Sequence, residues 1–184
     1  MALTQTQVSQ LYVSIFNRAS EGEGNTFWQT AGTKAEIANS MLDTQDAKDY
    51  FGSSLDSNQA FIEKIYQNTL NKTVEDDAAG IKLWVDALES GMSRGEVVAE
   101  MIESIKDYQV GGSKYATADQ ATKKAAQQFA NRVDVSDYTA DTFATIAVSD
   151  INSTLSFGGA LIVTANPATV TTAQAAVDAA NPAN

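Results

Sequence analysis

The residues best suited to chemistry lie in two stretches that share one order of residue types. Residues 15–28 read IFNRASEGEGNTFW, and residues 69–84 read TLNKTVEDDAAGIKLW. Carboxylates beside turn-permitting glycines are the kind of oxygen ligands that a hard cation such as calcium takes. Glu21, Glu23, Asp76 and Asp77 are therefore candidate calcium ligands, although the chain has neither an EF-hand pattern nor an Asp-rich glycine nonapeptide.

The same residues also fit an ordinary helical scaffold. A cation suits the negative end of a helix dipole and an anion suits its positive end. On this interpretation Arg18 closes one helix, and Glu21 and Glu23 open the next. Trp28 and Trp84 hold equal places in the two stretches and would anchor a core between helices.

Saccharide binding is the other chemistry that the residue types allow. An aromatic ring can stack on the apolar face of a pyranose, while amides and charged groups bond its hydroxyls. Tyr12, Tyr50, Tyr66 and Tyr108 recur at helical spacing, which favours the core. The candidate saccharide contacts lie in the expected loops: Arg18, Asn25, Asn71, Lys72, Tyr115 and Tyr138. We expect contact near the first four in a groove between two repeats.

Little in the sequence favours catalysis. The chain has no His and no Cys, which removes imidazole bases, thiol nucleophiles, disulfides and most zinc chemistry. Its 23 acidic residues supply many carboxylate pairs, but no motif selects one of them. We predict a non-enzymatic protein and keep a carboxylate-based glycan hydrolase as an alternative.

Composition and charge narrow the classes of partner. The 184 residues are 43% apolar and carry a formal net charge of −11, enough apolar mass for a core in one domain. Such an acidic chain repels phosphate backbones, so nucleic acid is not an expected partner. The N-terminal MALTQTQVSQ lacks the features of a secretory signal peptide, and the apolar run at 157–165 is too short to cross a bilayer.

Helical periodicity dominates the chain and predicts an all-α fold. The apolar stripe from Val8 to Phe16 is typical, and residues 93–96 have the spacing of a capping box. Matched blocks recur in the same order: Leu11-Tyr12 with Ile65-Tyr66, Phe16-Asn17-Arg18 with Leu70-Asn71-Lys72, Phe27-Trp28 with Leu83-Trp84, and Met41-Leu42 with Met101-Ile102. The sequence therefore predicts two stacked multi-helix repeats that bury a shared core.

A weaker echo follows the two repeats. Phe129, Asn131 and Arg132 are followed by acids but by no tryptophan, which indicates a degenerate third helical unit. Residues 148–155 suggest a short helix, and the Ala/Thr-rich end suggests a flexible tail. We predict repeats at 1–56 and 57–112, the third unit at 113–165, and a tail or linker to a missing C-terminal region at 166–184.

These blocks resemble a known family. LYVSIFNRASEGEGNTFW, ANSMLDTQDAKDYFG and FIEKIYQNTLNK with DDAAGIKLWVDAL look like the N-terminal region of campylobacter-type bacterial surface-layer (S-layer) proteins. They also look like a wider set of secreted bacterial proteins with a short helical repeat of undefined function. The resemblance covers about residues 3–165. It implies an anchoring region that binds lipopolysaccharide at the cell surface, in a protein exported by a type I route and self-associating in a lattice.

The prediction is therefore a non-enzymatic anchoring module that binds the saccharide of lipopolysaccharide or another surface glycan, aided by divalent cations such as calcium. Its net charge favours neutral O-chain sugars or cation bridges over direct contact with anionic phosphates. The first alternative is a structural or adhesin module that makes protein–protein lattice contacts. The glycan hydrolase is the second.

Overall fold

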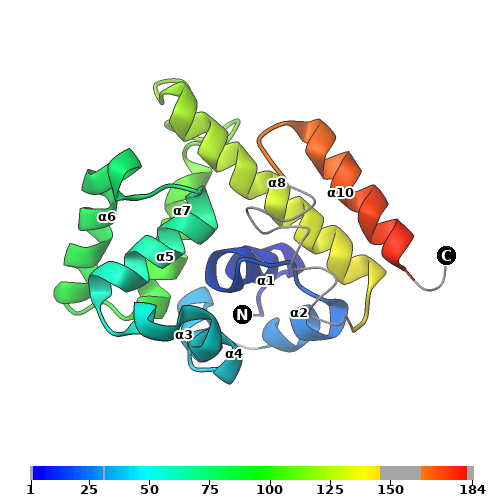
Figure 1. The fold of residues 1–184 in the computed structure, drawn as a ribbon, viewed down its shortest axis with the longest axis horizontal. Coiled ribbons are helices and arrows are strands. Elements are labelled where there is room, and N and C mark those ends of the chain that lie inside the picture. Colours follow the sequence, from blue (N-terminus) through cyan, green and yellow to red (C-terminus); the bar gives the residue numbers. More distant parts are fainter. Residues whose placement is uncertain (1, 31, 146–162, 182–184) are drawn as a thin grey trace.

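The computed structural model describes residues 2–30, 32–145 and 163–181, and these residues form an all-α fold without a β-strand (Figure 1). The N-terminal part comprises α1 (Gln5–Leu11), the π-helical η1 (Tyr12–Phe16), α2 (Gly22–Trp28), α3 (Lys34–Leu42), α4 (Gln45–Phe51) and the 3-10 turn η2 (Gly52–Leu55). It is followed by α5 (Asn58–Leu70), α6 (Val74–Glu89), α7 (Arg94–Lys106), α8 (Gln120–Thr142) and α10 (Pro167–Ala180).

Short polar side chains fix where the helices begin and end. The predicted capping box at Ser93 is confirmed: its hydroxyl accepts from the N–H of Glu96, whose carboxylate accepts from the N–H of Ser93. Thr33 and Glu36 form the same box at α3. At the other end, Asn17 closes η1 and Asn71 closes α5, both in the left-handed conformation that asparagine tolerates.

Three helical segments of the first repeat have a counterpart in the second, while α4 and η2 match no helix there. The rod of α1 and η1 matches α5, α2 matches α6, and α3 matches α7. The backbone of Asp77 leaves the helical region inside α6, and its carboxylate accepts from the N–H of Gly80 at 2.9 Å. The main part of α6 therefore begins after Asp77, just as α2 begins after Glu21.

The repeats meet through equivalent residues. Asn68 donates from its amide to the carbonyl of Ser14 at 3.0 Å, and these two residues hold the same place in their repeats. Gly95 of α7 lies against the carbonyl of Ala35 in α3, and these positions also correspond. Contacts between like positions are those of a two-fold arrangement, so the repeats stack face to face.

One shared core lies between these elements. It is made of fully buried apolar side chains from both repeats and from α8: Leu11, Ile15, Met41, Phe61, Ile62, Ile65, Ile81, Met101, Ile102 and Phe129. The helical stripes read from the sequence therefore face inward, as the periodicity predicts.

The residues after the second repeat pack more firmly than their composition suggests. α8 is one long helix that carries the echo residues Phe129, Asn131 and Arg132, all buried. The expectation of a tail from residue 166 needs correction for residues 167–180, which form α10 beside α8 (Figure 1). The short helix expected at 148–155 lies outside the described residues.

The carboxylates that cap the helices make the stability of the fold depend on pH. Hydrogen bonds from the backbone and side chains of Thr33, Thr73, Ser93 and Thr122 lower the pKa of their partners, Glu36, Asp76, Glu96 and Asp119. Because folding lowers these pKa values, the stabilisation is complete above the unfolded pKa and is lost as pH falls through the folded one. We expect the melting temperature to fall between about pH 5 and pH 3.

Thermal unfolding followed by circular dichroism across this pH range measures the effect. A variant with Glu36→Gln and Glu96→Gln should start from a lower melting temperature at pH 7 and lose less of it on acidification. A melting temperature that stays constant down to pH 3 would contradict the capping role.

Candidate functional site: two equivalent pockets

Each repeat builds a pocket from the same positions. The first pocket has a volume of about 600 Å³ and the second of about 540 Å³. Seven lining positions correspond in order: Tyr12 with Tyr66, Phe16 with Leu70, Arg18 with Lys72, Glu21 with Asp77, Gly24 with Gly80, Phe27 with Leu83, and Trp28 with Trp84. Residues 15–28 with Tyr12, and residues 69–84 with Tyr66, thus build the same kind of pocket twice.

A buried tyrosine paired with a carboxylate forms the inner wall of each pocket. The Tyr12 hydroxyl donates to Glu21 Oε1 at 3.4 Å, and the Tyr66 hydroxyl donates to Asp77 Oδ2 at 2.8 Å. Burial, and then the neighbouring carboxylate, raises the pKa of Tyr12 and of Tyr66 well above the ordinary value. Both hydroxyls therefore keep their protons at neutral pH and act as donors.

A glycine at the same place in each pocket makes room for this pair. A Cβ on Gly24 would lie 2.1 Å from Glu21 Oε1 and 2.5 Å from the Tyr12 hydroxyl. On Gly80 it would lie 2.3 Å from the Tyr66 hydroxyl and 2.5 Å from Asp77 Oδ2. A side chain at either position would push the tyrosine and the carboxylate apart.

Aromatic and apolar side chains form the outer part of each pocket. Trp28 and Trp84 are half-buried and pack on the core, so they are equivalent elements of the scaffold, as the repeat predicts. Beside them Phe27 is 63% exposed and Leu83 is 62% exposed. Each pocket therefore has a large exposed apolar side chain at the equivalent position.

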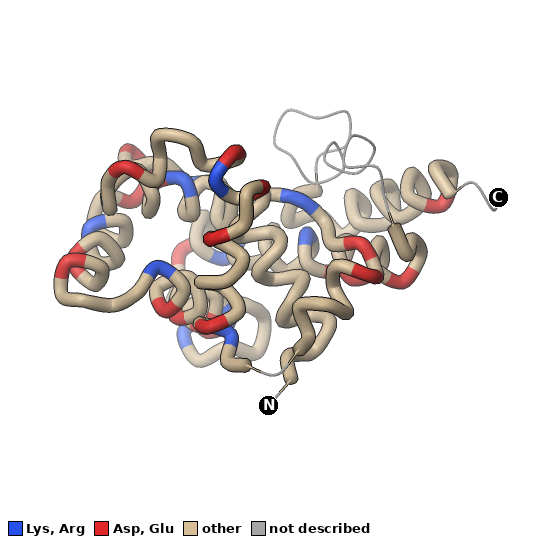
Figure 2. The backbone as a smooth tube through the Cα atoms, turned by 90° about the horizontal axis from the view of Figure 1, so that it is seen from below, with Lys and Arg blue, Asp and Glu red and all other residues tan. Residues whose placement is uncertain are grey.

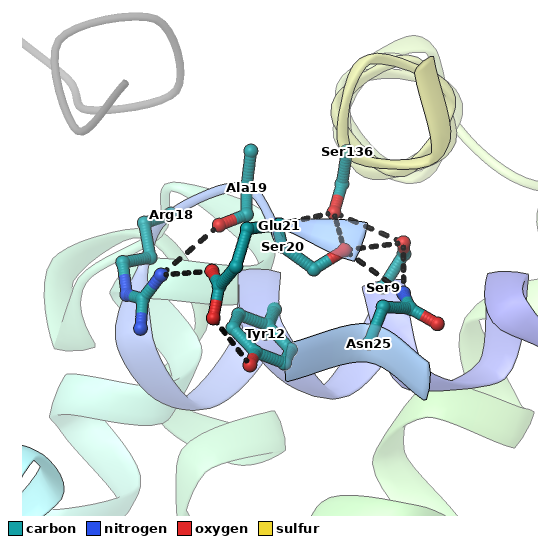
Figure 3. Close-up of polar contacts among 8 residues, drawn as sticks. All are labelled: Ser9, Tyr12, Arg18, Ala19, Ser20, Glu21, Asn25 and Ser136. Atoms are coloured by element: carbon teal, nitrogen blue, oxygen red, sulfur yellow. Dashed lines mark hydrogen bonds and ion pairs between the residues drawn. The ribbon is translucent and has the colours of Figure 1, made fainter. Parts of the chain in front are cut away.

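The basic residues of the two pockets differ in their contacts. Arg18 pairs with Glu21 at 3.0 Å, and its guanidinium lies 5.0 Å from the centre of the Tyr12 ring (Figure 3). Lys72, the equivalent residue, makes no ion pair or hydrogen bond within the described residues. The sequence predicts that these two residues share one groove between the repeats. In the structure they line separate pockets, Arg18 the first and Lys72 the second.

Asn25 belongs to the scaffold behind the first pocket. It is 1% exposed, and its amide donates to Ser20 Oγ at 2.9 Å and to Ser9 Oγ at 3.3 Å (Figure 3). Ser136 of α8 completes this buried network, at 3.0 Å from each of the two serine hydroxyls. The expectation that Asn25 contacts a saccharide is therefore corrected: its amide is already used inside the fold.

The candidate calcium ligands are placed at helix starts. Asp76 accepts from the N–H of Thr73 at 2.9 Å, while Glu21 and Asp77 accept from tyrosines and Glu23 lies exposed in the first turn of α2. Within the described ranges, no group of three or more acidic side chains could hold a metal ion. The scaffold interpretation accounts for the contacts of Glu21, Asp76 and Asp77.

The remaining predicted contacts lie apart from one another. Asn71 is exposed and lines a groove of about 810 Å³ along α8. Tyr115 is half-buried, with Lys123 Nζ 4.9 Å from its ring centre. Tyr138 donates to Asp178 Oδ1 at 2.6 Å and so links α8 to α10. Of these three, only Asn71 borders a pocket described here.

Reading the sequence residue by residue did not reveal that Tyr12 and Tyr66 line the two pockets. Their helical spacing correctly predicts burial, yet both residues also line the pockets. Full alignment of the two repeats, including Gly24 and Gly80, would have found the sites, because the same tyrosine, acid, glycine and tryptophan recur in order.

Comparisons with known proteins give one match. The model of a domain of unknown function, DUF4214, matches residues 38–107, which run from α3 to the end of α7 and include Tyr66, Asp77 and Trp84. No curated protein and no solved structure matches the chain. In the part of the chain that the structure describes, no helix has the length and apolar character needed to cross a bilayer.

Proposed function

We propose that this chain is a non-enzymatic, glycan-binding module that anchors a bacterial surface-layer protein to the saccharide of lipopolysaccharide. The duplicated pocket is the observation that supports it best. Each copy offers the edge or face of a half-buried indole beside polar groups from a tyrosine and a carboxylate. A sugar has the matching character, with apolar C–H faces and a rim of hydroxyls.

Charge favours the neutral part of such a ligand. Acidic and basic positions are interspersed over most of the described backbone, while the end of α8 and α10 carry acids alone (Figure 2). With a net charge of −11, the chain gains nothing by approaching anionic core phosphates. The proposed partner is therefore the O-chain, with calcium or another divalent cation bridging any acidic sugars, at the extracellular cell surface after type I export.

Replacing the two tryptophans tests the proposal. Trp28→Ala and Trp84→Ala should each weaken binding to smooth lipopolysaccharide, by about tenfold to a hundredfold if the indole is an anchor. Surface plasmon resonance on immobilised lipopolysaccharide measures this, with circular dichroism to show that the variants fold. Val110→Ala is the control, because Val110 is 73% exposed and lines neither pocket.

The ligand is varied in the same experiment. Lipopolysaccharide without O-chain should bind weakly. A chelator of divalent cations should weaken binding only to lipopolysaccharide whose sugars are acidic. Equal binding of smooth and truncated lipopolysaccharide, or unchanged binding by both tryptophan variants, would contradict the proposal.

The exposed Phe27 and Leu83 favour a second candidate, a module that contacts protein in a lattice. Analytical ultracentrifugation distinguishes the two. Self-association that is lost in a Phe27→Ser, Leu83→Ser variant would support the lattice contact.

A further inference from the structure

The two pockets continue into different surroundings. The first borders a hollow lined by Gly22, Glu23, Thr26, Phe27, Ala140, Asp141 and Ala144, in which the charged side chains are acids. The second shares Leu70, Lys72, Asp119 and Ala125 with the groove of about 810 Å³ along α8. The second pocket therefore opens past Lys72 into a polar groove.

The polar lining of this groove suits a ligand rich in oxygen acceptors. Its acids are engaged: Asp76 caps α6 through Thr73, and Asp119 caps α8 by accepting from the N–H of Thr122 at 2.7 Å. Lys72 and Lys124 form no ion pair or hydrogen bond with any described residue, although the charge of Lys72 contributes to lowering the pKa of Asp76 and of Asp119. Asn71, Gln128, Thr164 and Asn166 also line it, although the Gln128 amide donates to the carbonyl of Val163 and Asn166 Oδ1 accepts from the N–H of Ala168.

The floor of the second pocket has the opposite character. Met101, Ile105 and Ala126 are buried core residues that reach its lining, and Trp84 and Leu83 stand at its side. Polar and charged side chains, among them Tyr66, Asp77 and Lys114, complete the lining, and a pocket of this size is of the kind that binds one compact ligand group. A ligand that fills both cavities must therefore be extended, with repeated hydroxyl or acidic groups.

We infer that the second pocket and the α8 groove form one cleft for a linear glycan, whereas the first pocket holds a single sugar unit. One unit lies against Trp84, Lys72 contacts an oxygen at the junction, and the following units run past Lys124 towards Asn166. The inference rests on the proposed function, because the ligand class is the same. It adds that affinity depends on chain length at the second repeat alone.

The experiment uses the two tryptophans as reporters. Trp28→Phe leaves Trp84 as the only tryptophan, and Trp84→Phe leaves Trp28. The probes are O-chains released by mild acid from smooth lipopolysaccharide and separated into single repeat units and longer chains. With Trp84 as reporter, the longer chains should bind about tenfold more tightly than single units. With Trp28 as reporter, the two should bind alike.

Lysine variants in the Trp28→Phe background locate the cleft. Lys124→Ala should weaken binding of the longer chains about threefold to tenfold and leave single units unchanged, and Lys72→Ala should weaken both. Lys82→Ala is the matched control, since Lys82 lies on α6 outside both cavities and pairs with Asp86.

The outcomes separate the two proposals. Length-independent binding at Trp84, or equal effects of Lys124→Ala and Lys82→Ala, would overturn the cleft while leaving glycan binding in place. No response of either tryptophan to any released chain or to intact lipopolysaccharide would overturn both.

Discussion

Arg132→Ala should lower the free energy of unfolding by about 2–6 kcal/mol, because two buried acceptors would lose their charged donor at about 1–3 kcal/mol each. Arg132 is 1% exposed, and its guanidinium donates to the carbonyl of Asn68 and to the side-chain oxygen of Asn17. These acceptors lie at the ends of α5 and η1, so one cation serves the negative ends of two helices. Burial lowers the pKa of Arg132 to about 10, which still leaves it charged at neutral pH.

Urea unfolding followed by circular dichroism measures this loss. Arg132→Lys keeps the charge but not the fork of donors, and should fall between the wild type and Arg132→Ala. Lys124→Ala, at an exposed position of the same helix, should change stability by less than about 0.5 kcal/mol. If Arg132→Ala matched Lys124→Ala, the guanidinium would not join the repeats.

Gly95→Ala should cost about 1–3 kcal/mol, although alanine is the better helix former by about 1 kcal/mol. A Cβ on Gly95 would lie 2.3 Å from the carbonyl oxygen of Ala35 and 2.6 Å from the backbone nitrogen of Asn39. Backbone cannot rotate away as a side chain can, so α3 and α7 would have to separate. Their separation would also break the bond from the Gly95 N–H to Asn39 Oδ1, which is 2.7 Å long.

Glu100→Ala is the matched comparison for Gly95→Ala, because Glu100 is an exposed position of the same helix. It should leave the unfolding midpoint almost unchanged. A Gly95→Ala protein more stable than the wild type would show that helix propensity decides, and that α3 and α7 do not pack this closely.

Local patterns explain what could be predicted from the sequence. The all-α class follows from apolar periodicity, and helix starts follow from short-range signals such as the capping box at Ser93. The duplication also yields the equivalence of Trp28 and Trp84. The periodicity and the capping signals involve residues within a few positions of one another, while the duplication is found by aligning two stretches of the sequence.

Long-range contacts explain what could not be predicted. Polar residues are expected at the surface, yet Arg132 is buried because acceptors from distant segments satisfy it, and Asn25 is buried because it donates to Ser9 of α1. Likewise, the pairing of Tyr138 with Asp178 joins helices whose sequences give no sign of contact. The pockets themselves depend on the angle between helices, which periodicity does not specify.

The face-to-face packing of the repeats has a consequence for assembly. Ser14 with Asn68 and Ala35 with Gly95 are contacts of like with like, as in a homodimer whose subunits have been fused. Two separate copies of one repeat, each offering the same face to the other, would make the same contacts. Such a self-complementary pairing is complete at two, so the present chain cannot grow into a filament through that face.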